Sequence, residues 1–271
     1  DTQSLIQEKL NAIELGSLKG QVRFEDVSFS YNSMVPVLKN INFSVHPGEL
    51  VALVGESGSG KSTIARLIPR FYDVSNGCIT VDGIDIRDVT TASLRKNVVA
   101  AQQDVFLFSA TIRDNIAFGA VNASMEQIVA VAKTAHLHDF VQSLPDGYDT
   151  WVGERGVTLS GGEKQRLAIA RTLLTNPRVL ILDDSTSNVD AETEYLIRQA
   201  LDKLIKGQTT FIITHRLPII KNADLILVLK EGQIVERGRH NDLMARNGLY
   251  QQIYQSQSSV TQDSRESLIE E

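Results

Sequence analysis

Cysteine, tryptophan and long apolar runs are scarce in this chain of 271 residues, which contains one cysteine and one tryptophan. The single cysteine, Cys78, cannot form a disulfide within the chain, which is consistent with a reducing compartment. The longest apolar runs, Val179–Leu182 and Leu225–Leu229, are far shorter than the roughly 20 residues that span a bilayer. We therefore expect no membrane-spanning segment in this chain.

A block of basic residues is also missing, and the formal net charge is −6. Nucleic-acid backbones attract clustered positive charge, so we expect no nucleic-acid partner. Apolar residues make up 42% and charged residues 22% of the chain, which is ordinary globular usage and predicts a core. The sequence starts with Asp1 rather than methionine and has no signal-like start, so we expect a fragment of a longer protein.

Two kinds of apolar pattern predict two kinds of strand. Apolar and polar residues alternate near residues 22–31 and 41–45, with a slip at Glu25 and Asp26 that predicts a bulge. Continuous apolar runs are typical of strands buried on both faces, and they occupy residues 50–54, 98–101, 179–182 and 210–213. Helical patterns between the runs cover residues 62–71, 124–135, 160–174 and 190–204. This order predicts an α/β fold: a doubly wound parallel core with an antiparallel sheet beside it on the N-terminal side.

The same patterns divide the chain into three parts. Residues 1–19 are polar with loosely spaced apolar residues, and we interpret them as a linker. Residues 20–255 form the globular domain, in which about residues 111–174 hold helical patterns and no clear strand, and so predict a helical insertion. Residues 256–271 are polar, and we expect a disordered tail.

A phosphate-binding loop follows the first buried run. The segment Gly55-Glu-Ser-Gly-Ser-Gly60-Lys61-Ser62 lies between a predicted strand and a predicted helix, which is the context that this pattern requires. Its backbone N–H groups and the helix start favour phosphate, Lys61 can reach the β/γ oxygens, and the Ser62 hydroxyl can ligate Mg²⁺. The alternative, a Gly/Ser-rich turn with a solvated lysine, does not explain the strand–loop–helix context. The expected ATP-binding residues are Gly55, Ser57, Gly58, Ser59, Gly60, Lys61, Ser62 and Thr63.

Two carboxylates end a second buried run. Asp183 lies at the carboxyl end of its predicted strand, where open α/β sheets bind ligands, and it can hold Mg²⁺ directly or through water. An acidic pair in this position could instead start a turn or cap a helix. The phosphate loop in the same sheet favours the metal role.

A third pattern starts a long helix. Ser160 and Glu163 match a capping box, so helix nucleation alone is one interpretation. The intervening Gly161 and Gly162 are poor helix formers, each costing about 1 kcal/mol relative to alanine. A bare helix start can bind an anion, and because this chain's own loop holds its own phosphates, we expect the nucleotide of a second copy here.

These three motifs, in this order and spacing, resemble the ATP-binding cassette (ABC) proteins, and within them exporter-type half-transporters. The resemblance covers about residues 20–255 and implies a P-loop NTPase core. It implies that Tyr31 stacks on adenine, that Gln103 touches Mg²⁺ and faces the membrane domain, that Asp190 follows the acidic strand, and that His215 contacts the γ-phosphate. Residues 153–156 and 111–116 also resemble the corresponding segments of exporter-type cassettes.

The chain departs from the family at three positions. The family's catalytic glutamate follows the magnesium aspartate, and here that residue is Asp184. One methylene less withdraws the carboxylate by about 1.5 Å, and an error of about 1 Å can cost about 100-fold in rate. We therefore expect slow hydrolysis at this chain's own site, with Asp184, His215, Gln103 and Lys61 as catalytic residues. Glu163 replaces the usual glutamine, and Trp151 a usual glutamate.

The resemblance implies an ATP- and Mg²⁺-dependent ATPase that dimerises around ATP to power export. Its expected partners are a second nucleotide-binding domain, from a different chain or from a copy of itself, and the exporter's transmembrane domain, to which residues 1–19 would lead. Its expected place is the cytoplasmic face of a membrane. Two alternatives stay open: a regulatory ATP-binding module with negligible hydrolysis, and a soluble ABC ATPase that does not transport.

Overall fold

A computed structural model describes residues 6–32, 35–101, 106–120, 122–153, 158–184, 191–214 and 216–266 of the chain. Within these ranges, the description leaves out the side chains of residues 184, 191 and 259–266. Gln103, Asp190, His215 and residues 154–156 lie outside the described residues.

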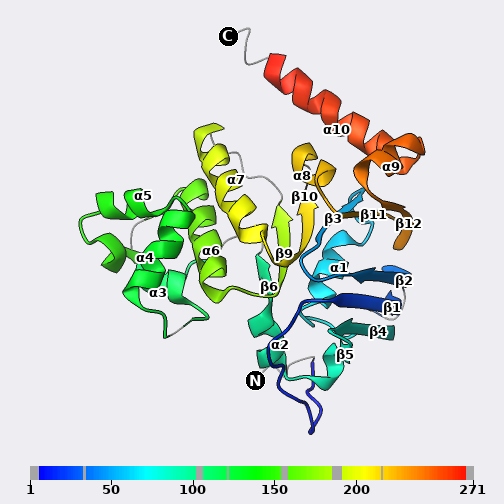
Figure 1. Cartoon of the computed structure of the whole chain (residues 1–271), viewed down its shortest axis with the longest axis horizontal. Coiled ribbons are helices and arrows are strands. Elements are labelled where there is room, and N and C mark those ends of the chain that lie inside the picture. The colour runs from blue at the N-terminus through cyan, green and yellow to red at the C-terminus, as the bar shows by residue number, and fades with distance from the viewer. Residues whose placement is uncertain are drawn as a thin grey trace.

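A six-stranded sheet runs through the middle of the molecule, in the order β12-β11-β3-β10-β9-β6 (Figure 1). Five strands are parallel, and β12 pairs with β11 in the antiparallel direction. All six residues of β10 are buried, as the continuous apolar runs predict for strands covered on both faces. The strands are β3 (Leu50–Gly55), β6 (Val98–Ala101), β9 (Val179–Asp184), β10 (Thr209–Thr214), β11 (Leu225–Lys230) and β12 (Gln233–Gly238).

An antiparallel sheet in the order β2-β1-β4-β5 lies beside this core. Its strands are β1 (Val22–Phe29), β2 (Leu38–Val45), β4 (Asn76–Val81) and β5 (Ile84–Asp85). The predicted bulge is confirmed: the register between β1 and β2 shifts between Phe24 and Val27, and Asp26 has a φ of 47°. Both sheets contribute to one hydrophobic cluster, since Phe24 and Phe43 are buried together with Phe211 of β10.

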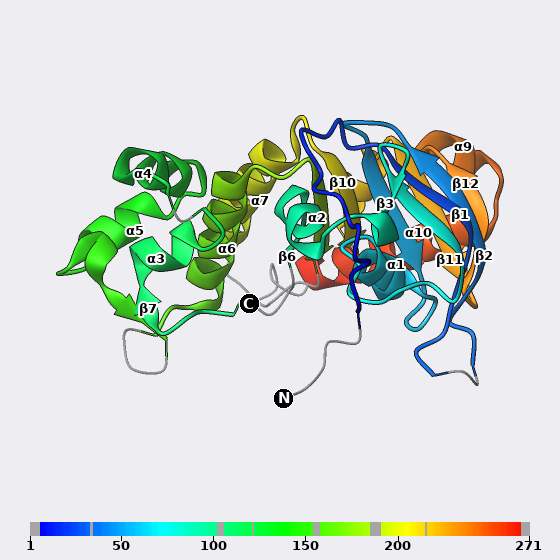
Figure 2. The ribbon, with the colours of Figure 1, turned by 90° about the horizontal axis from the view of Figure 1, so that it is seen from below.

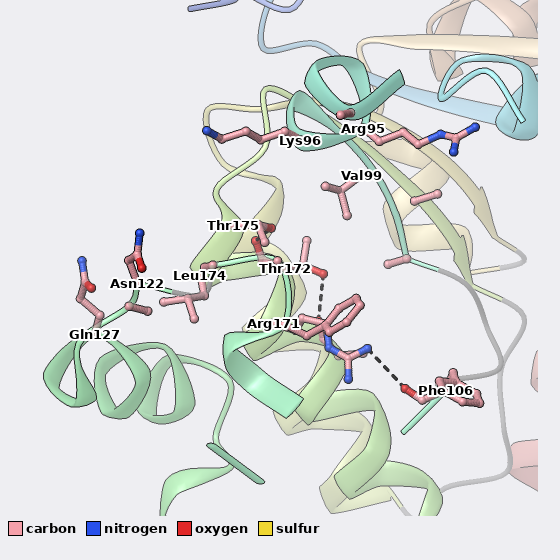
Figure 3. Close-up of a pocket in the computed structure, with 18 residues that line it drawn as sticks. Arg95, Lys96, Val99, Phe106, Asn122, Gln127, Arg171, Thr172, Leu174 and Thr175 are labelled. Carbon is pink, nitrogen blue, oxygen red and sulfur yellow. Dashed lines mark hydrogen bonds between the residues drawn. The ribbon is translucent and has the colours of Figure 1, made fainter. Parts of the chain in front are cut away.

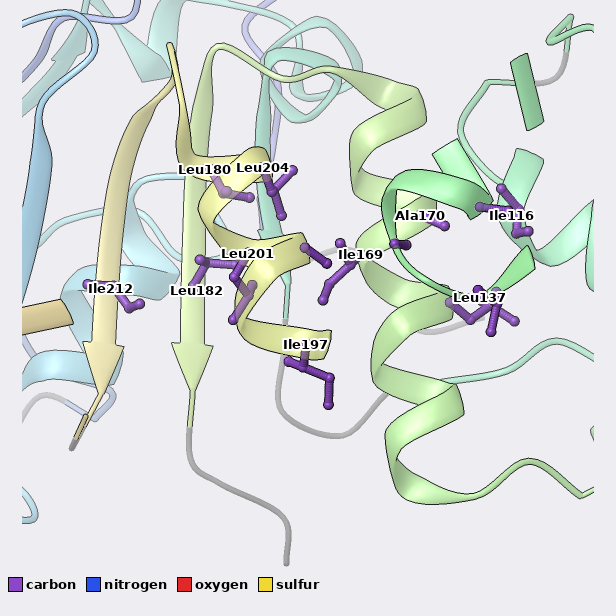
Figure 4. Packing of buried hydrophobic residues seen from close by; sticks show 14 of the residues in the cluster. Ile116, Leu137, Ile169, Ala170, Leu180, Leu182, Ile197, Leu201, Leu204 and Ile212 are labelled. Carbon is purple, nitrogen blue, oxygen red and sulfur yellow. The ribbon is translucent and has the colours of Figure 1, made fainter. Parts of the chain in front are cut away.

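Helices cover both faces of the six-stranded sheet. Alternate residues of β3 divide between two hydrophobic clusters: Val51 and Leu53 pack with α1, and Ala52 and Val54 face the cluster that contains α6 and α7. Figure 4 shows Leu201 and Leu204 of α7 beside Leu180 and Leu182 of β9, with Ile169 of α6 on the other side of α7. The helices are α1 (Lys61–Leu67), α2 (Thr91–Asn97), α3 (Ile112–Ala117), α4 (Met125–Thr134), α5 (His138–Ser143), α6 (Gly161–Thr175), α7 (Ala191–Ile205), α8 (Leu217–Lys221), α9 (His240–Ala245) and α10 (Leu249–Glu266), with 3₁₀ turns η1 (Ile86–Asp88) and η2 (Gly147–Asp149).

Helices α3, α4 and α5 lie to one side of the core, next to α6 (Figures 1 and 2). This region corresponds to the expected helical insertion, but it also contains a small strand pair, β7 (Ala110–Thr111) with β8 (Trp151–Val152). The expectation of no clear strand between residues 111 and 174 is therefore wrong at this pair. Strands of two residues are too short to give an apolar alternation in the sequence.

Both ends of the chain contain more structure than the sequence analysis predicted. Residues 6–19 run along η1 and α2, where Ile13 forms a parallel bridge with Val89. At the other end, α10 continues to Glu266, into the segment that we expected to be disordered, and Figure 1 shows it projecting from the body. Within the described part of the chain, no helix is both long and apolar enough to cross a membrane.

Candidate functional site

The phosphate loop lies between the end of β3 and the start of α1, as predicted. Gly60 is the N-cap of α1 with a φ of 108°, a left-handed conformation that strongly favours glycine. A Cβ at this position would lie 2.6 Å from Cδ2 of Leu38, so the loop also has no space for a side chain there. The glycine keeps the backbone of the loop against the core and turns the chain into α1.

The ammonium group of Lys61 lies inside the loop. Its Nζ donates to the carbonyl oxygens of Gly55 and Glu56, each at 2.7 Å, and to Oγ of Ser59 at 3.4 Å. Burial lowers the pKa of Lys61, and the nearby negative charge of Asp183 opposes this effect. The loop therefore concentrates a positive charge at the position where the sequence predicts the β- and γ-phosphates.

The other loop residues divide by exposure. Ser57, Gly58 and Ser62 are exposed, whereas Ser59 and Thr63 are buried. The Ser59 carbonyl accepts a hydrogen bond from the Gly232 amide at 3.2 Å, which fixes the back of the loop to the turn after β11. The Ser62 hydroxyl, in the first turn of α1, is thus accessible to a metal, and Ser59 has a structural place in the loop.

Tyr31 stands beside the loop. Its hydroxyl is 3.2 Å from Oγ1 of Thr63, and the side chain is 44% exposed, so one part of the ring is open to a ligand. The ring contacts Phe29 and Tyr72 edge to face, with centroids 4.8 and 5.1 Å apart. Tyr72 was not predicted, because it lies 41 residues along the chain from Tyr31 and has no motif of its own.

The acidic strand end lies at the edge of the sheet where the described parts of β6 and β10 also end. Asp183 pairs with Ile213 of β10, and Asp184 pairs with Thr214, directly before His215. Ala101, at the end of β6, pairs with Leu182 and leads toward Gln103. The carboxyl ends of parallel strands meet at one edge, so the backbones bring these segments together.

A metal at this edge would have few protein ligands. Among the described residues, no three histidine, cysteine or acidic side chains come together. Ser62 and Asp183 supply the hydroxyl and carboxylate oxygens that Mg²⁺ prefers, and Mg²⁺ sites commonly use one or two protein ligands together with phosphates. The residues present fit such a site. The Asp184 carboxylate lies outside the described side chains.

The Ser160-Gly-Gly segment forms the start of α6. The predicted capping box is present: the Ser160 amide donates to Oε2 of Glu163 at 2.7 Å, and the Glu163 amide donates to Oγ of Ser160 at 3.3 Å. A Cβ on Gly161 would meet nothing within 4 Å, but a Cβ on Gly162 would lie 2.2 Å from Cγ2 of Thr193. Gly162 is therefore needed for packing against α7, whereas Gly161 is open to the outside.

The phosphate loop and the Ser160 segment belong to opposite faces of the sheet. Helix α1 packs through Ile64 and Leu67 into one hydrophobic cluster, and α6 packs through Leu167 and Ala170 into the other. Figures 1 and 2 show the two helices on different sides of β6 and β9. The structure does not bring these two motifs together within one chain.

A cleft that the sequence did not predict lies between α2, β6 and α6, with a volume of about 1020 Å³ (Figure 3). Exposed Phe106 and Phe118 line it. Arg171 of α6 donates to the carbonyl oxygens of Asn115 (2.8 Å) and Phe106 (3.3 Å), and burial lowers its pKa. Buried Asn115 in turn donates to the carbonyl oxygen of Phe108 at 3.0 Å. This network fixes the segment after residues 102–105 against α6.

Comparisons with known proteins agree with the geometry. Residues 38–187 match the ABC transporter family. An uncharacterised ABC transporter ATP-binding protein of Bacillus subtilis (strain 168) is 51% identical over 257 residues, which are 95% of this chain and 45% of that protein. An ATP-dependent lipid A-core flippase of Syntrophus aciditrophicus (strain SB) is 48% identical over 93% of this chain and 42% of its own length. The chain thus spans less than half the length of these relatives.

Among solved structures, a bacterial Atm1-family ABC exporter with ATP bound has a TM-score of 0.86 and 46% identity, over 93% of this chain and 44% of that one. A putative multidrug export ATP-binding/permease protein of Staphylococcus aureus (strain NCTC 8325 / PS 47) is 52% identical over 89% of this chain and 42% of that protein. The chain belongs to the ABC transporter family and is homologous to the ATP-binding domains of its exporters, which bind and hydrolyse ATP.

Proposed function

We propose that this chain is the ATPase domain of an exporter that closes with a second nucleotide-binding domain around ATP and thereby drives a membrane domain. The observation that carries the proposal is the half-buried ammonium of Lys61, which lies within 2.7 Å of two loop carbonyls and is influenced by the charge of Asp183. A triphosphate in the loop would exchange these carbonyl contacts for stronger charge-assisted hydrogen bonds.

Ser62 and Asp183 are the residues that would hold Mg²⁺, with Gln103 as a further contact. When bound, the ion would neutralise charge on the phosphates. Tyr31 would hold the adenine with its exposed ring face, and its hydroxyl next to Thr63 fixes the ring relative to α1. In this arrangement the loop positions the phosphates and the aromatic side chain positions the base.

Hydrolysis at this chain's own site is proposed to be slow. Asp184 takes the place at which the family has a glutamate, and its backbone is fixed in β9 by pairing with Thr214. Because the backbone position is fixed, the shorter side chain cannot be compensated by a shift of the strand. His215 and Gln103 would act on the γ-phosphate and the metal. The same substitution favours the second candidate function, a regulatory ATP-binding module with negligible hydrolysis.

The start of α6 would contact the phosphates of the ATP that is bound to the second nucleotide-binding domain. Ser160 and Gly161 are exposed, and α6 packs on the sheet face opposite α1, so the two motifs suit two different nucleotides. Each ATP would lie between the loop of one domain and the Ser160 segment of the other, with Asp190 near the contact. Closure then follows from the higher affinity of ATP for the paired state. The partner is a different chain or a second copy.

The membrane domain would contact the cleft beside Phe106 and Phe118. Phe106 and Phe118 are both exposed and line the same cleft, and an exposed apolar patch of this kind suits a docked segment from another domain. Arg171 and Asn115 hold this surface against α6, so a movement there would reach the start of the same helix. The location that follows is the cytoplasmic face of a membrane.

A Ser160→Arg variant tests the shared site. The arginine blocks the helix start, and so it should damage hydrolysis at the partner's site while this chain's own affinity for Mg-ATP stays unchanged. In the assay, the variant is mixed with a second copy that carries Asp184→Glu, and ATP turnover is measured. Two further mixtures use a second copy that carries Asp184→Glu together with either Ser160→Arg or Lys61→Ala. Ser124→Arg, at the equivalent cap of α4, is the matched control. Loss of the variant's own ATP binding, with the partner's turnover intact, would overturn the proposal.

A further inference from the structure

The start of α6 carries its own negative charge. Oε2 of Glu163 accepts a hydrogen bond from the Ser160 amide at 2.7 Å, so the carboxylate folds back over the first turn. Glu163 is half-buried there, next to exposed Ser160 and Gly161. The peptide dipoles of a 15-residue helix leave a positive partial charge at this end, and Glu163 partly neutralises it.

Helix α4 has the same cap without the charge. The Ser124 amide donates to Oε1 of Gln127 at 2.8 Å, and the Gln127 amide donates to Oγ of Ser124 at 3.3 Å. The corresponding distances in α6 are 2.7 and 3.3 Å. A neutral amide therefore closes the box as well as a carboxylate does, and helix capping does not require the charge of Glu163.

We infer that Glu163 sets how much ATP is needed to close the two domains, because its carboxylate opposes the phosphates of the partner's nucleotide at the start of α6. The inference rests on the proposed function, which brings those phosphates to Ser160 and Gly161. The carboxylate acts through its charge, which repels the phosphates. The acceptor that it offers the Ser160 amide would be offered by a glutamine as well. It is a specificity-determining residue for pairing, not a catalytic residue.

Glu163→Gln removes the charge and retains the cap. The ATP concentration for half-maximal dimerisation of the chain, measured by analytical ultracentrifugation, should fall about two- to fivefold in 50 mM salt. The difference should shrink in 500 mM salt, because ions screen exposed charges. The affinity of the chain for a fluorescent ATP analogue, measured at protein concentrations too low for pairing, should not change. The melting temperature should fall by a few degrees at most, because the favourable charge at the helix start is lost.

Gln127→Glu is the matched control, since it places the same charge on the equivalent cap of α4. It should leave dimerisation unchanged. Equal ATP requirements for wild type and Glu163→Gln would overturn the inference, as would an equal and opposite shift in Gln127→Glu, which would indicate an effect of overall charge. If neither wild type nor Glu163→Gln dimerises at any ATP concentration, a second copy is not the partner and the inference about this pair is wrong, whereas the proposed pairing with a different chain is not contradicted.

Discussion

Gly162 of α6 and Thr193 of α7 are in direct contact, and the contact leaves no space for a side chain on Gly162. A Cβ added to Gly162 would lie 2.2 Å from Cγ2 of Thr193. The starts of the two helices are thus locked together at the edge of the proposed shared site. The glycine is required by the chain's own packing, so the sequence-based interpretation, which assigned both glycines to a phosphate, is incomplete.

Gly162→Ala should destabilise the domain by about 1–3 kcal/mol, because overpacking of a buried contact costs this much. Thr193→Ser removes the methyl group that the new Cβ would meet and retains the hydroxyl. The double variant should therefore recover at least half of the loss, as measured by urea unfolding. Gly161→Ala, with open space at its Cβ, is the control. If Gly162→Ala lowers the free energy of unfolding and Thr193→Ser does not reduce this loss, the contact between Gly162 and Thr193 is not its cause.

Arg70 joins the N-terminal segment to the core. The side chain is 2% exposed, and it donates to the carbonyl oxygens of Gln7 (3.2 Å) and Ile86 (3.4 Å) and to the carboxylate of Asp73 (2.7 Å). Near it, the Thr91 amide donates to Glu8 at 2.7 Å. Residues 6–19 are thus attached to the domain rather than loosely linked to it.

Arg70→Met should remove the donor from the buried carbonyl oxygen of Ile86 and from the part-buried carbonyl oxygen of Gln7, and should cost about 2–4 kcal/mol. Limited proteolysis should then cleave within residues 6–19 before the rest of the domain unfolds. Arg66→Met, at an exposed position of α1, should change neither the free energy of unfolding nor the rate of cleavage within residues 6–19. Equal protection of residues 6–19 in Arg70→Met and wild type would show that the segment is held by other contacts.

His240 makes the C-terminal helix sensitive to pH. Its Nδ1 is 2.7 Å from the hydroxyl of buried Tyr250, and burial, followed by the charge of Lys221, lowers the pKa of His240 below its ordinary value. The folded state therefore favours the neutral ring. Its contribution to stability is fully present above the unfolded pKa of about 6.5 and is lost as the pH falls toward the lower folded pKa.

Hydrogen exchange at the Ile253 and Tyr254 amides should accordingly speed up, relative to the intrinsic rate, as the pH falls below about 6.5. His240→Gln cannot titrate and should remove this extra pH dependence. The prediction is wrong if the variant and the wild type show the same pH dependence between pH 5 and 7.

Asp184→Glu tests whether the shortened carboxylate limits hydrolysis. The longer side chain would restore about 1.5 Å of reach, and steady-state turnover by the chain should rise by about tenfold to 100-fold. Asp184→Glu combined with Lys61→Ala should show no rise, since the phosphates would no longer be held. No increase in Asp184→Glu alone, with ATP affinity intact, would mean that another step limits the rate.

The local features of the fold could be predicted from the sequence because their signals are local. The continuous apolar run before Gly55 predicted β3, and the spacing of Ser160 and Glu163 predicted the capping box; both are present. The slip at Glu25 and Asp26 predicted the bulge in β1. In each case the residues that decide the structure are neighbours in the chain.

Features that depend on distant residues could not be predicted. Tyr72 beside Tyr31, Thr193 against Gly162 and the carbonyl of Gln7 on Arg70 each join segments that only the fold brings together. The extension of α10 was also missed, because its glutamines and serines have no apolar periodicity. The roles of Gln103, Asp190 and His215 stay predictions, since these residues lie outside the described part of the chain.

The central claim is that the loop around Lys61 grips the triphosphate, and calorimetric titration of the chain with Mg-ATP tests it most directly. Lys61→Ala should weaken binding by about 100-fold or more, because charge-assisted hydrogen bonds contribute about 1.5–3 kcal/mol each. Lys39→Ala, at an exposed lysine of β2, should bind as the wild type does. Wild-type affinity in Lys61→Ala would contradict the assignment of the phosphate site, and with it the account of ATP-driven closure.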